Sequence, residues 1–429
     1  MTPRSWKTSQ LPTLLNVMKS GGTPTTSRSE FYGGDIPFVA IEDMTACNRY
    51  LASTEKTLTP DGLASSNAWL VPEGSLLYSI YATLGVPRIT LVPVATNQAI
   101  LAMIARANLI DRDFLYYWFE HARDSIINSN CSQTTQKNLS ATIVKTFMVK
   151  HPADVAEQTK IAEVLSTVDR AIEQTEALIA KQQRVKTGLM QDLLTRGIDE
   201  HGNLRSEQTH QFKDSPLGRI PMEWESAPLA VFVPSAEYGI STSLGDSGYP
   251  VLRMNNLLNG EAELSDLKFT DAPVPEHLWL RNGDVLFNRT NSWEHVGRTG
   301  IWRGQIESAT FASYLVRLNP DPDKLLPEML NYWLNWERTQ IAMRRQATPA
   351  VQQVNINPTN LRSIPAAFPR DLDEQTAITV RIAAVRKVLD AYREHLYKLT
   401  SMKAGLMQDL LTGERRVTAL LEQREGATT

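Results

Sequence analysis

The eight residues Gly188-Leu-Met-Gln-Asp-Leu-Leu-Thr195 occur a second time, unchanged, as Gly405-Leu-Met-Gln-Asp-Leu-Leu-Thr412. A shorter identity precedes each copy, because Glu157-Gln-Thr159 returns as Glu374-Gln-Thr376 at the same offset of 217 residues (405 minus 188 and 374 minus 157). A continuous helix explains the equal spacing, since one inserted residue would turn its apolar face by about 100°. The two stretches therefore predict two long helices of one repeated kind.

The residues between these identities follow the heptad pattern of a coiled coil, with core candidates in alternating steps of four and three. At about 1.5 Å per residue, a helix of about 39 residues is about 60 Å long and needs a partner. The other copy is the simplest partner, paired antiparallel because the intervening block returns the chain; two unrelated amphipathic core helices are the alternative. The predicted seams are Ile161, Leu165, Val168, Ile172, Thr175, Ile179, Gln182, Lys186, Leu189 and Leu193, and Ile378, Ile382, Val385, Leu389, Tyr392, Leu396, Leu399, Lys403, Leu406 and Leu410.

Two residue types are unexpected in such helices. Gly188 and Gly405 each cost a helix about 1 kcal/mol relative to alanine, and their matched positions predict a matched close approach of another segment. The seam lysines Lys186 and Lys403 either extend their ammonium groups outward to water or fix the register of the pair, and we favour the outward orientation.

The repeat extends, more weakly, into the block that precedes each helix. Pro72-Glu-Gly-Ser-Leu-Leu-Tyr78 parallels Arg281-Asn-Gly-Asp-Val-Leu-Phe287. Short β-rich runs punctuated by Gly and Pro alternate there with helical stretches at Asp113–Ile127 and Pro327–Arg344. The expected fold class is α+β: two similar α/β globular domains separated by two long antiparallel coiled-coil helices, in a pseudo-twofold internal repeat.

This order divides the chain into six segments. The linker between the halves is polar and free of helix, and the tail after Glu414 has no apolar pattern, so we expect the tail to fray. The segments are a first globular domain (1–152), a first long helix (153–197), a linker (198–215), a second globular domain (216–370), a second long helix (371–413) and a C-terminal tail (414–429).

Polar loops in both blocks carry side chains that can read the edges of DNA bases. Asn and Gln pair with adenine and Arg and Lys with guanine, and each good pair contributes about 1 to 3 kcal/mol of discrimination. One such loop is more often an ordinary solvated turn, but these loops occur at corresponding places in both blocks. The predicted DNA-binding residues are Tyr81, Thr83, Thr134, Gln136, Lys137, Arg289, Thr290, Asn291, Gln352 and Gln353.

Composition limits the class of protein. With 42% hydrophobic and 21% charged residues the chain is an ordinary globular protein, and its net charge of -3 mildly opposes DNA binding. No apolar run approaches the about 20 residues that cross a membrane, and no signal segment is visible, so we expect a cytoplasmic protein without a membrane partner. Cys47 and Cys131 are too few for a disulfide framework, and we expect both to be reduced.

Sequence signatures of catalysis are missing. The chain has no GxxxxGK[ST] nucleotide loop, and Asn319-Pro-Asp and Asn357-Pro-Thr do not fit the Asn/Asp-Pro-Pro-aromatic motif of adenine methyltransferases. The acid-x-Lys stretch Asp266-Leu-Lys268 lacks the preceding Pro-Asp of a nuclease, and the seven histidines lack zinc-ligand spacing. We therefore expect no catalytic site, no cofactor and no metal.

With these motifs in hand, the chain resembles the specificity subunits of type I restriction-modification systems over nearly its whole length. The resemblance rests on the repeated helix starts and ends, on Gly21-Gly-Thr-Pro24 with Tyr32-Gly-Gly-Asp-Ile-Pro37, and on Leu217-Gly-Arg-Ile-Pro221 with Trp224. It implies two target-recognition domains that each read half of an interrupted, asymmetric double-stranded DNA site, with the helices as spacer. It also implies two DNA-adenine methyltransferase subunits as partners and, in the full enzyme, translocase and restriction subunits.

The identical helix ends indicate that both meet the same partner or each other, and we expect Met190, Leu194, Met407 and Leu411 to be subunit-interface residues. Two other functions remain open. One is a coiled-coil interaction scaffold without DNA readout, against which the paired polar loops argue. The other is a solitary enzyme with an unfamiliar active site, for which no set of residues is visible.

Overall fold

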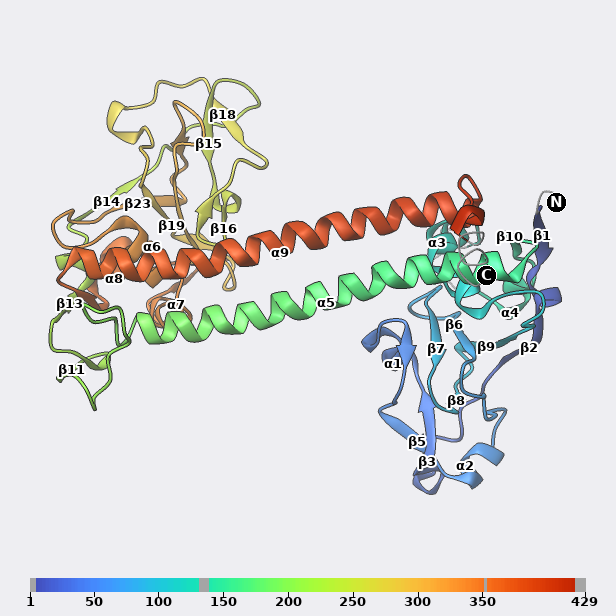
Figure 1. Ribbon diagram of the computed structural model, residues 1–429. Helices are drawn as coiled ribbons and strands as arrows, with labels where there is room; N and C mark the ends of the chain where they lie inside the picture. Colours follow the sequence, from blue (N-terminus) through green and yellow to red (C-terminus); the bar gives the residue numbers. More distant parts are fainter. Residues whose placement is uncertain (1–4, 131–138, 351–352, 421–429) are drawn as a thin grey trace, which may run out of the picture. The chain divides into compact units, whose positions relative to one another are not determined.

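The computed structural model describes residues 5–130, 139–350 and 353–420 (Figure 1). The chain forms two compact units: unit 1 comprises residues 1–177 and 394–429, and unit 2 comprises residues 178–393. Helix α5 (Val155–Leu193) begins in unit 1 and ends in unit 2, whereas α9 (Leu372–Thr412) begins in unit 2 and ends in unit 1. Each unit therefore holds a globular part, the start of one long helix and the end of the other.

Unit 1 has three sheets. The main sheet has the order β2-β9-β6-β7-β4, with strands Leu15–Ser20, Ile100–Ala105, Leu76–Ser79, Pro87–Thr90 and Tyr50–Leu51. The second has the order β5-β3-β8 (Lys56–Leu58, Tyr32–Val39, Ala95–Thr96), and β1 (Trp6–Gln10) pairs with β10 (Met148–Pro152). The helices are α1 (Ile41–Ala46), α2 (Pro60–Ala64), α3 (Arg112–Asn130) and α4 (Ala141–Lys145).

Unit 2 repeats this plan with additions. Its main sheet has the order β14-β23-β19-β21-β17-β16 (Ser235–Tyr238, Leu315–Asn319, Val285–Asn288, Thr299–Ile301, Glu261–Ala262, Leu257–Leu258). A second sheet has the order β18-β15-β22 (Lys268–Thr270, Tyr249–Leu252, Thr310–Phe311), and β13 (Trp224–Pro228) pairs with β26 (Pro365–Pro369). The additions are the hairpin β11–β12 (Phe212–Ser215, Gly218–Pro221) and the sheet β20-β25-β24 (Thr290–Asn291, Gln353–Asn355, Thr348–Ala350). The helices are α6 (Pro327–Leu334), α7 (Glu337–Arg344) and α8 (Pro358–Ser363).

The strand pairings show that the two globular parts share one topology. The single parallel pair of the main sheet described in unit 1, β4 with β7, has its counterpart in β17 with β21. The parallel pair β3 with β8 has its counterpart in β15 with β22. Trp6 lies opposite Pro152 in unit 1, as Trp224 lies opposite Pro369 in unit 2. The predicted α+β fold with an internal repeat is confirmed.

A buried glutamine joins the start of each long helix to its globular part. The Gln158 amide donates to the carbonyls of Leu109 and Pro152, and its oxygen accepts from the Asp111 backbone N–H at 2.7 Å. Gln375 makes the same three bonds, to Lys324 O, Pro369 O and Leu326 N. Both side chains are fully buried, and a buried amide without partners would be costly. The repeated Glu-Gln-Thr sequence is therefore explained by contacts within the chain.

The glutamate beside each glutamine holds the segment that follows the other helix. In unit 2, Glu374 forms a two-pronged ion pair with Arg205, and its Oε1 accepts from Trp224 Nε1 at 3.2 Å. In unit 1, fully buried Glu157 pairs in the same way with Arg416, and the adjacent Val417 lies in the hydrophobic core. The prediction that the tail frays after Glu414 is wrong for these residues, because Arg416 supplies the charge that a buried carboxylate requires.

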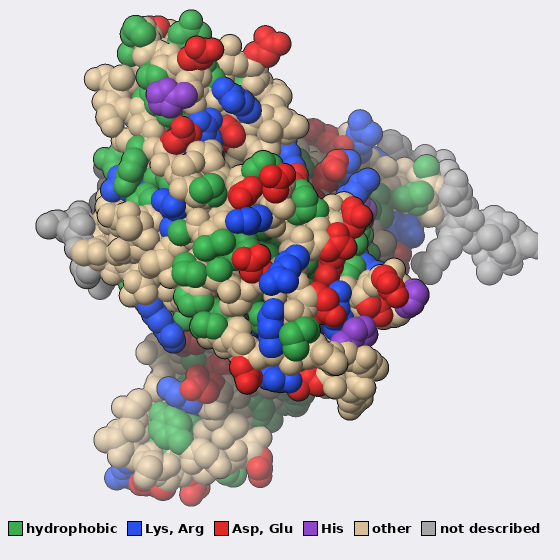
Figure 2. Space-filling view, turned by 90° about the vertical axis from the view of Figure 1, so that its left-hand side faces the viewer, with side chains coloured by type: hydrophobic (Ala, Val, Ile, Leu, Met, Phe, Trp, Pro, Cys, Tyr) green, Lys and Arg blue, Asp and Glu red, His purple; other side chains and the backbone are tan. Residues whose placement is uncertain are grey.

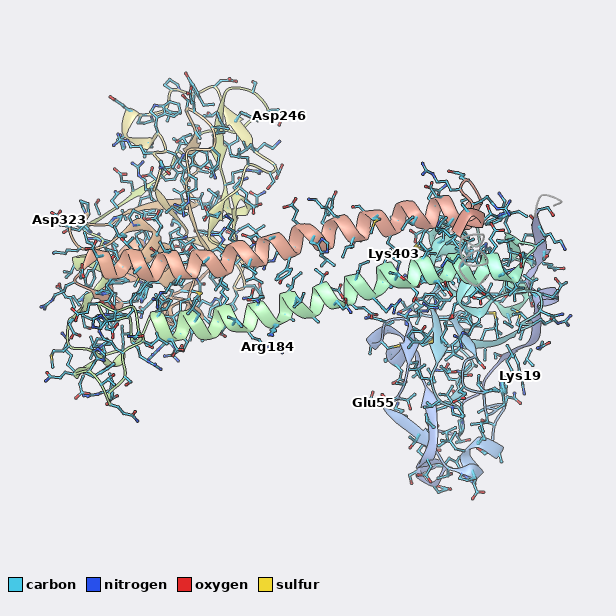
Figure 3. The ribbon with its side chains drawn as sticks, viewed as in Figure 1. Lys19, Glu55, Arg184, Asp246, Asp323 and Lys403 are labelled. Atoms are coloured by element: carbon cyan, nitrogen blue, oxygen red, sulfur yellow. The ribbon has the colours of Figure 1, made fainter. Side chains whose placement is uncertain are left out.

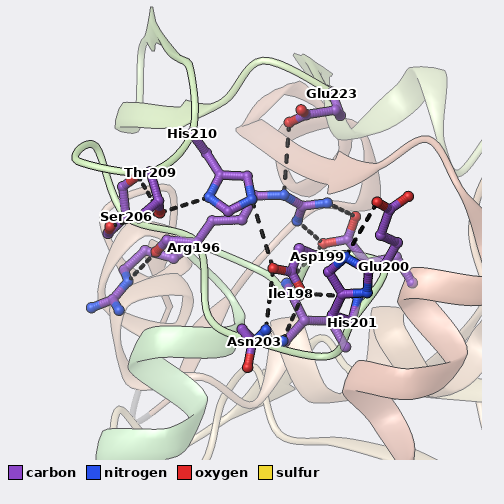
Figure 4. Close-up of polar contacts among 12 residues, drawn as sticks. Arg196, Ile198, Asp199, Glu200, His201, Asn203, Ser206, Thr209, His210 and Glu223 are labelled. Carbon is purple, nitrogen blue, oxygen red and sulfur yellow. Dashed lines mark hydrogen bonds and ion pairs between the residues drawn. The ribbon is translucent and has the colours of Figure 1, made fainter.

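The linker folds into a polar loop against the start of α9 (Figure 4). The Asp199 carboxylate accepts from the backbone N–H groups of His201 (3.0 Å) and Asn203 (2.7 Å). These hydrogen bonds, the one from Asn203 first, hold the pKa of Asp199 below its ordinary value. A hollow of about 840 Å³ lies beside this loop and is lined mainly by charged groups, among them Arg370, Asp373 and Arg381.

Burial along α5 and α9 matches the predicted seams. Every seam residue in both helices is buried or half-buried, whereas flanking positions such as Val185 and Tyr397 are exposed. The predicted close approach at Gly188 and Gly405 is wrong: both are exposed, and a Cβ added to either would meet nothing within 4 Å.

The seam lysines also differ from prediction. Lys403, labelled in Figure 3, forms an ion pair of 2.6 Å with Asp169 instead of extending to water. Lys186 is half-buried on the corresponding turn of α5.

The helix predicted at Pro327–Arg344 is broken into α6 and α7. Asn335, between them, donates to the Thr299 carbonyl at 3.0 Å, and Gln340 donates to Gly297 O and Leu334 O. These side chains hydrogen-bond the backbone at the break, which a periodicity argument does not capture. Across the described ranges, no helix is long and apolar enough to cross a membrane.

Candidate nucleic-acid interface

One β-hairpin occurs in both units with the same backbone closure. It is formed by β6 and β7 in unit 1 and by β19 and β21 in unit 2. We call the residues beyond the closure the hairpin tips: 80–84 in unit 1 and 289–296 in unit 2. The closing bonds are Gly85 N to Ser79 O (2.9 Å) and Ser79 N to Val86 O (3.1 Å), and Gly297 N to Asn288 O (2.9 Å) and Asn288 N to Arg298 O (2.8 Å).

Each hairpin tip has a buried anchor and an exposed aromatic ring. Leu84 and Val296 precede the closing glycines and lie in the cores of their units. Tyr81 is 40% exposed and Trp293 is 53% exposed. Because burying such rings is favourable, the two exposed rings at matched tips are candidates for contact with another molecule.

A second predicted loop returns to each hairpin tip. The backbone N–H of Ile356 donates to Arg289 O at 2.8 Å, and that of Leu139 donates to the corresponding Ile80 O at 3.0 Å. In unit 2, β20 pairs with β25, so that Thr290 lies opposite Asn355 and Asn291 opposite Val354. The structure thereby brings the predicted residues Thr290, Asn291 and Gln353 together on one small sheet, and Arg289 directly precedes its strand β20.

The remaining predicted residues differ in accessibility. Gln353 is exposed, and Thr83 and Asn291 are half-buried. Thr290, which lies in a strand of the small sheet, is only 9% exposed. The predicted residues Thr134, Gln136, Lys137 and Gln352, and Cys131, lie outside the described residues. Cys47 is a free thiol.

Arg289 is the most firmly positioned cation of the unit 2 tip. Its guanidinium lies 5.0 Å from the ring centroid of Tyr238, and its Nη1 donates to Ser313 O at 3.4 Å. Its Nε is out of contact with solvent and has no partner among the described residues. The backbone N–H of Arg289 donates to the carbonyl of Tyr314, whose ring, like that of Tyr238, is nearly half exposed.

Sequence reasoning did not identify several residues of this region. Trp293, Tyr238 and Tyr314 are exposed aromatics, and no local pattern distinguishes them from core aromatics. Asn288 is fully buried, and neither atom of its amide group has a partner in the described part of the chain. The sequence did offer one signal for Asn288, because this polar residue directly follows the apolar run Val285–Phe287.

The electrostatic character of this region is mixed. On the face shown in Figure 2, basic and acidic side chains are interspersed, in keeping with the net charge of -3. Glu294, in the unit 2 tip, has a pKa below the ordinary value because its own backbone N–H and Ser292 hydrogen-bond its carboxylate, with Arg344 and His295 adding attraction. On that face, therefore, the basic side chains do not form one continuous surface.

Four residues were expected at subunit interfaces, and the structure places most of them in the cores. Met190 and Leu194 are 7% and 4% exposed and belong to the core of unit 2, while Leu411 is 2% exposed and Met407 packs against the same core in unit 1. Met190, Leu194 and Leu411 already pack within their own unit, and direct contact of these side chains with a partner subunit stays a prediction.

The globular parts are joined to the helices by charged networks of opposite sign. In unit 1, Tyr117 donates to Asp169 at 2.6 Å and accepts from Arg49 at 3.0 Å. The position that corresponds to Asp169 in unit 2 is Arg386, which forms an ion pair of 2.6 Å with Glu261. The repeat therefore preserves the connection while reversing its charges.

In residues 5–130, 139–350 and 353–420, no group of three His, Cys, Asp or Glu could hold a metal ion.

Comparison with known proteins shows which family the chain resembles. Residues 3–182 match the type I restriction modification DNA specificity domain. The chain is 23% identical to the type I restriction enzyme MjaVIII specificity subunit of Methanocaldococcus jannaschii, over 97% of this chain and 95% of that protein.

Two solved structures share the fold. The S subunit of a type I restriction-modification system from M. genitalium matches with a TM-score of 0.58 and 13% identity, over 96% of this chain and 97% of that one. A chain solved in work on complex assembly and conformational transition of the type I R-M system matches with a TM-score of 0.58 and 16% identity, over 95% and 98%. With its duplicated architecture and matched hairpins, the chain is similar to type I restriction-modification specificity subunits over nearly its whole length.

Proposed function

We propose that this chain is the non-catalytic DNA-recognition subunit of a type I restriction-modification enzyme, in which each unit reads one half of an interrupted, asymmetric DNA site. The observation that carries the proposal is the duplicated hairpin, whose backbone bonds agree in both units while the tip side chains differ. Two readers with one frame and unlike side chains fit a site with two unlike halves. The DNA-contacting residues are Tyr81, Thr83, Thr134, Gln136 and Lys137 for one half, and Arg289, Thr290, Asn291, Gln352 and Gln353 for the other.

The same proposal includes protein partners. Two adenine methyltransferase subunits, one for each unit, supply the chemistry that this chain lacks, and restriction subunits join them in the full enzyme. A duplicated subunit offers two like surfaces, which explains two copies of one partner geometrically.

The docking surface for these copies is the exposed part of the repeated helix ends. Of the eight identical residues, the leucines pack inward, whereas Gly188, Gln191, Gly405 and Gln408 are exposed. The cores of the units do not require these four identities, and the glycines lower helix stability by about 1 kcal/mol each. Contact with one common partner at both ends accounts for their retention.

Bulk added at the glycine tests the docking surface. Because Gly188 faces open space, Gly188→Leu should leave the melting temperature of the chain unchanged or higher, yet reduce co-purification with the methyltransferase about tenfold. Ala180→Leu is the matched control, since it adds the same side chain at an exposed position of α5 whose counterpart is Tyr397. Equal co-purification of both variants would remove this surface from the proposal.

Mapping of methylated adenines tests the function. The chain is expressed with its methyltransferase subunit in a host without adenine methylation, and modified adenines are located across the genome by single-molecule sequencing. We expect a two-part motif with a fixed gap that is absent without this chain. In vitro, binding should weaken steeply with salt, because phosphate contacts release counterions.

A coiled-coil scaffold without DNA readout is the other candidate. It would give a soluble complex with active methyltransferase but no sequence motif. That result would contradict the proposed function and favour the scaffold.

A further inference from the structure

We infer that Arg289, held by Tyr238, reads a guanine in the half-site recognised by unit 2. The inference rests on the proposed function and assigns one base chemistry to one side chain. It follows from the position of the guanidinium and from a comparison that the repeat itself supplies.

The repeat aligns Arg289 with a specific residue of unit 1. Phe287 lies opposite Val316, which lies opposite Tyr238, and the corresponding ladder of unit 1 runs through Tyr78, Leu101 and Ser20. Arg289 lies two residues after Phe287, and Ile80 lies two residues after Tyr78. The backbone N–H of Arg289 donates to Tyr314 O, and that of Ile80 donates to Ala99 O. The pairs are therefore Arg289 with Ile80, Tyr238 with Ser20, and Tyr314 with Ala99.

The side chains at these matched positions have unlike chemistry. Unit 2 has a guanidinium and two exposed rings, whereas unit 1 has a buried isoleucine and two small residues. The DNA backbone is chemically the same in both half-sites, so residues that hold phosphates are expected to be alike in the two units. Residues that read bases must differ when the half-sites differ. Arg289 belongs to the second group.

Two contacts of Arg289 restrict its guanidinium. The guanidinium lies 5.0 Å from the ring centroid of Tyr238, and the bond from Nη1 to Ser313 O limits its rotation. Within the described residues that long bond is the one side-chain hydrogen bond of Arg289. A phosphate requires charge but no fixed plane, whereas two parallel bonds to a base edge require a placed fork.

The donor pattern selects guanine. A guanidinium carries donors and no acceptor. In the major groove only guanine presents two adjacent acceptors, N7 and O6, while adenine and cytosine present an amino donor and thymine a single oxygen. The half-site of unit 2 therefore contains a guanine opposite this hairpin tip.

The first test is the methylation motif of variants in the complete complex. Arg289→Ala should relax one guanine of the unit 2 half-site to any base and leave the other half-site and the gap unchanged. Methylation at sites that keep this guanine should fall about tenfold or more. Arg289→Lys should not restore the preference, and Tyr238→Phe should retain it while Tyr238→Ala weakens it. Arg184→Ala is the control, because it removes an exposed guanidinium of unit 2 on α5 (Figure 3).

A second measurement uses the unaltered protein and does not depend on the folding of a variant. Duplexes with 7-deazaguanine at the identified position lack N7, and the wild-type complex should methylate them about tenfold more slowly, whereas the Arg289→Ala complex should not distinguish them. Equal rates of the wild type on both duplexes would overturn the inference.

Other outcomes are equally decisive. A uniform loss at all sequences that lysine restores would make Arg289 a phosphate contact, and an unchanged motif would remove it as a reader. A wild-type complex without any motif would instead overturn the proposed function, and this inference with it.

Discussion

Trp293 and Tyr81 occupy similar positions on the two hairpin tips, although the other side chains of the tips differ. Each is an exposed ring on a hairpin tip anchored by a buried aliphatic residue. Stacking of a ring on a base or insertion at a base step does not depend strongly on the base, because every base has a π-face. A feature shared by both units is therefore suited to holding the duplex, and features that differ are suited to reading it.

Trp293→Ala should lower DNA affinity without changing the methylation motif. Loss of one stacked ring costs about 1 to 3 kcal/mol, which corresponds to about fivefold to 150-fold in the dissociation constant. Binding of the complex to its own site and to a site with an altered unit 2 half, measured by fluorescence anisotropy, should weaken by the same factor. Tyr397→Ala, which removes a ring 73% exposed on α9, should have no such effect. A motif altered at one base would instead show that Trp293 reads sequence.

At the scale of the helices, the heptad seam could be predicted because it depends on local spacing. Burial of the seam residues follows from the period alone, and the burial along α5 and α9 agrees with it. Contacts between distant residues could not be predicted: Glu157 and Arg416 are 259 residues apart, and no periodicity joins them. For the candidate site, polar loops could be found from composition, but the equivalence of Arg289 with Ile80 required the strand pairing.

The two seam lysines occupy the same heptad position, but the charges around them have opposite signs. Lys403 meets Asp169, whereas Lys186 meets Arg386 and Arg393, with Asp390 as a partial counterweight. Burial is the main cause that lowers the pKa of Lys186, and the two arginines lower it further. The charged form of Lys186 is therefore less favourable in the folded chain than in the unfolded chain.

Lys186→Met should stabilise unit 2 at neutral pH. The penalty of the charged lysine is fully present below its folded pKa and disappears as the pH rises through that pKa toward the ordinary value of 10.5. The gain should reach up to about 1 kcal/mol at pH 7 and shrink in alkaline solution. Urea unfolding of the two proteins at pH 7 and at higher pH measures this difference. Lys403→Met, at the matched seam position, should destabilise unit 1, and stabilisation by both substitutions would contradict the assignment of charges.

At the scale of the whole molecule, each unit is closed by the segment that follows the helix ending in it. Gly197 and Gly413 leave α5 and α9 with positive φ angles of 61° and 78°. A Cβ at Gly197 would lie 2.2 Å from an oxygen of Glu374, and one at Gly413 would lie 2.9 Å from the Trp6 ring. The division of the chain into six segments stays a prediction. The linker and the first residues of the tail nevertheless have the same structural role, because each closes the unit in which the preceding helix ends.

Arg416→Ala should therefore destabilise unit 1 although it lies near the end of the chain. It leaves the fully buried Glu157 carboxylate unpaired, which costs about 3 kcal/mol, the lower end for a broken buried pair because Arg416 is 31% exposed. Arg415→Ala removes only an exposed pair with Asp409 and should cost less than about 1 kcal/mol. Hydrogen exchange at the start of α5, compared between the two variants, measures the difference. Equal protection in both would show that the tail does not close the unit.

Unit 2 is one unbroken stretch of chain, residues 178–393, whereas unit 1 is assembled from what precedes and follows it. In the sequence, unit 2 is thus inserted into unit 1, and both boundaries between the units lie within the long helices. The heptad register of each helix is the same on both sides of its boundary. Two recombination events, one in each helix, would replace unit 2 as a whole and leave unit 1 intact. Because such an exchange carries the hairpin tip of unit 2 with everything that supports it, under the proposed function it would replace one half-site and leave the other half-site unchanged.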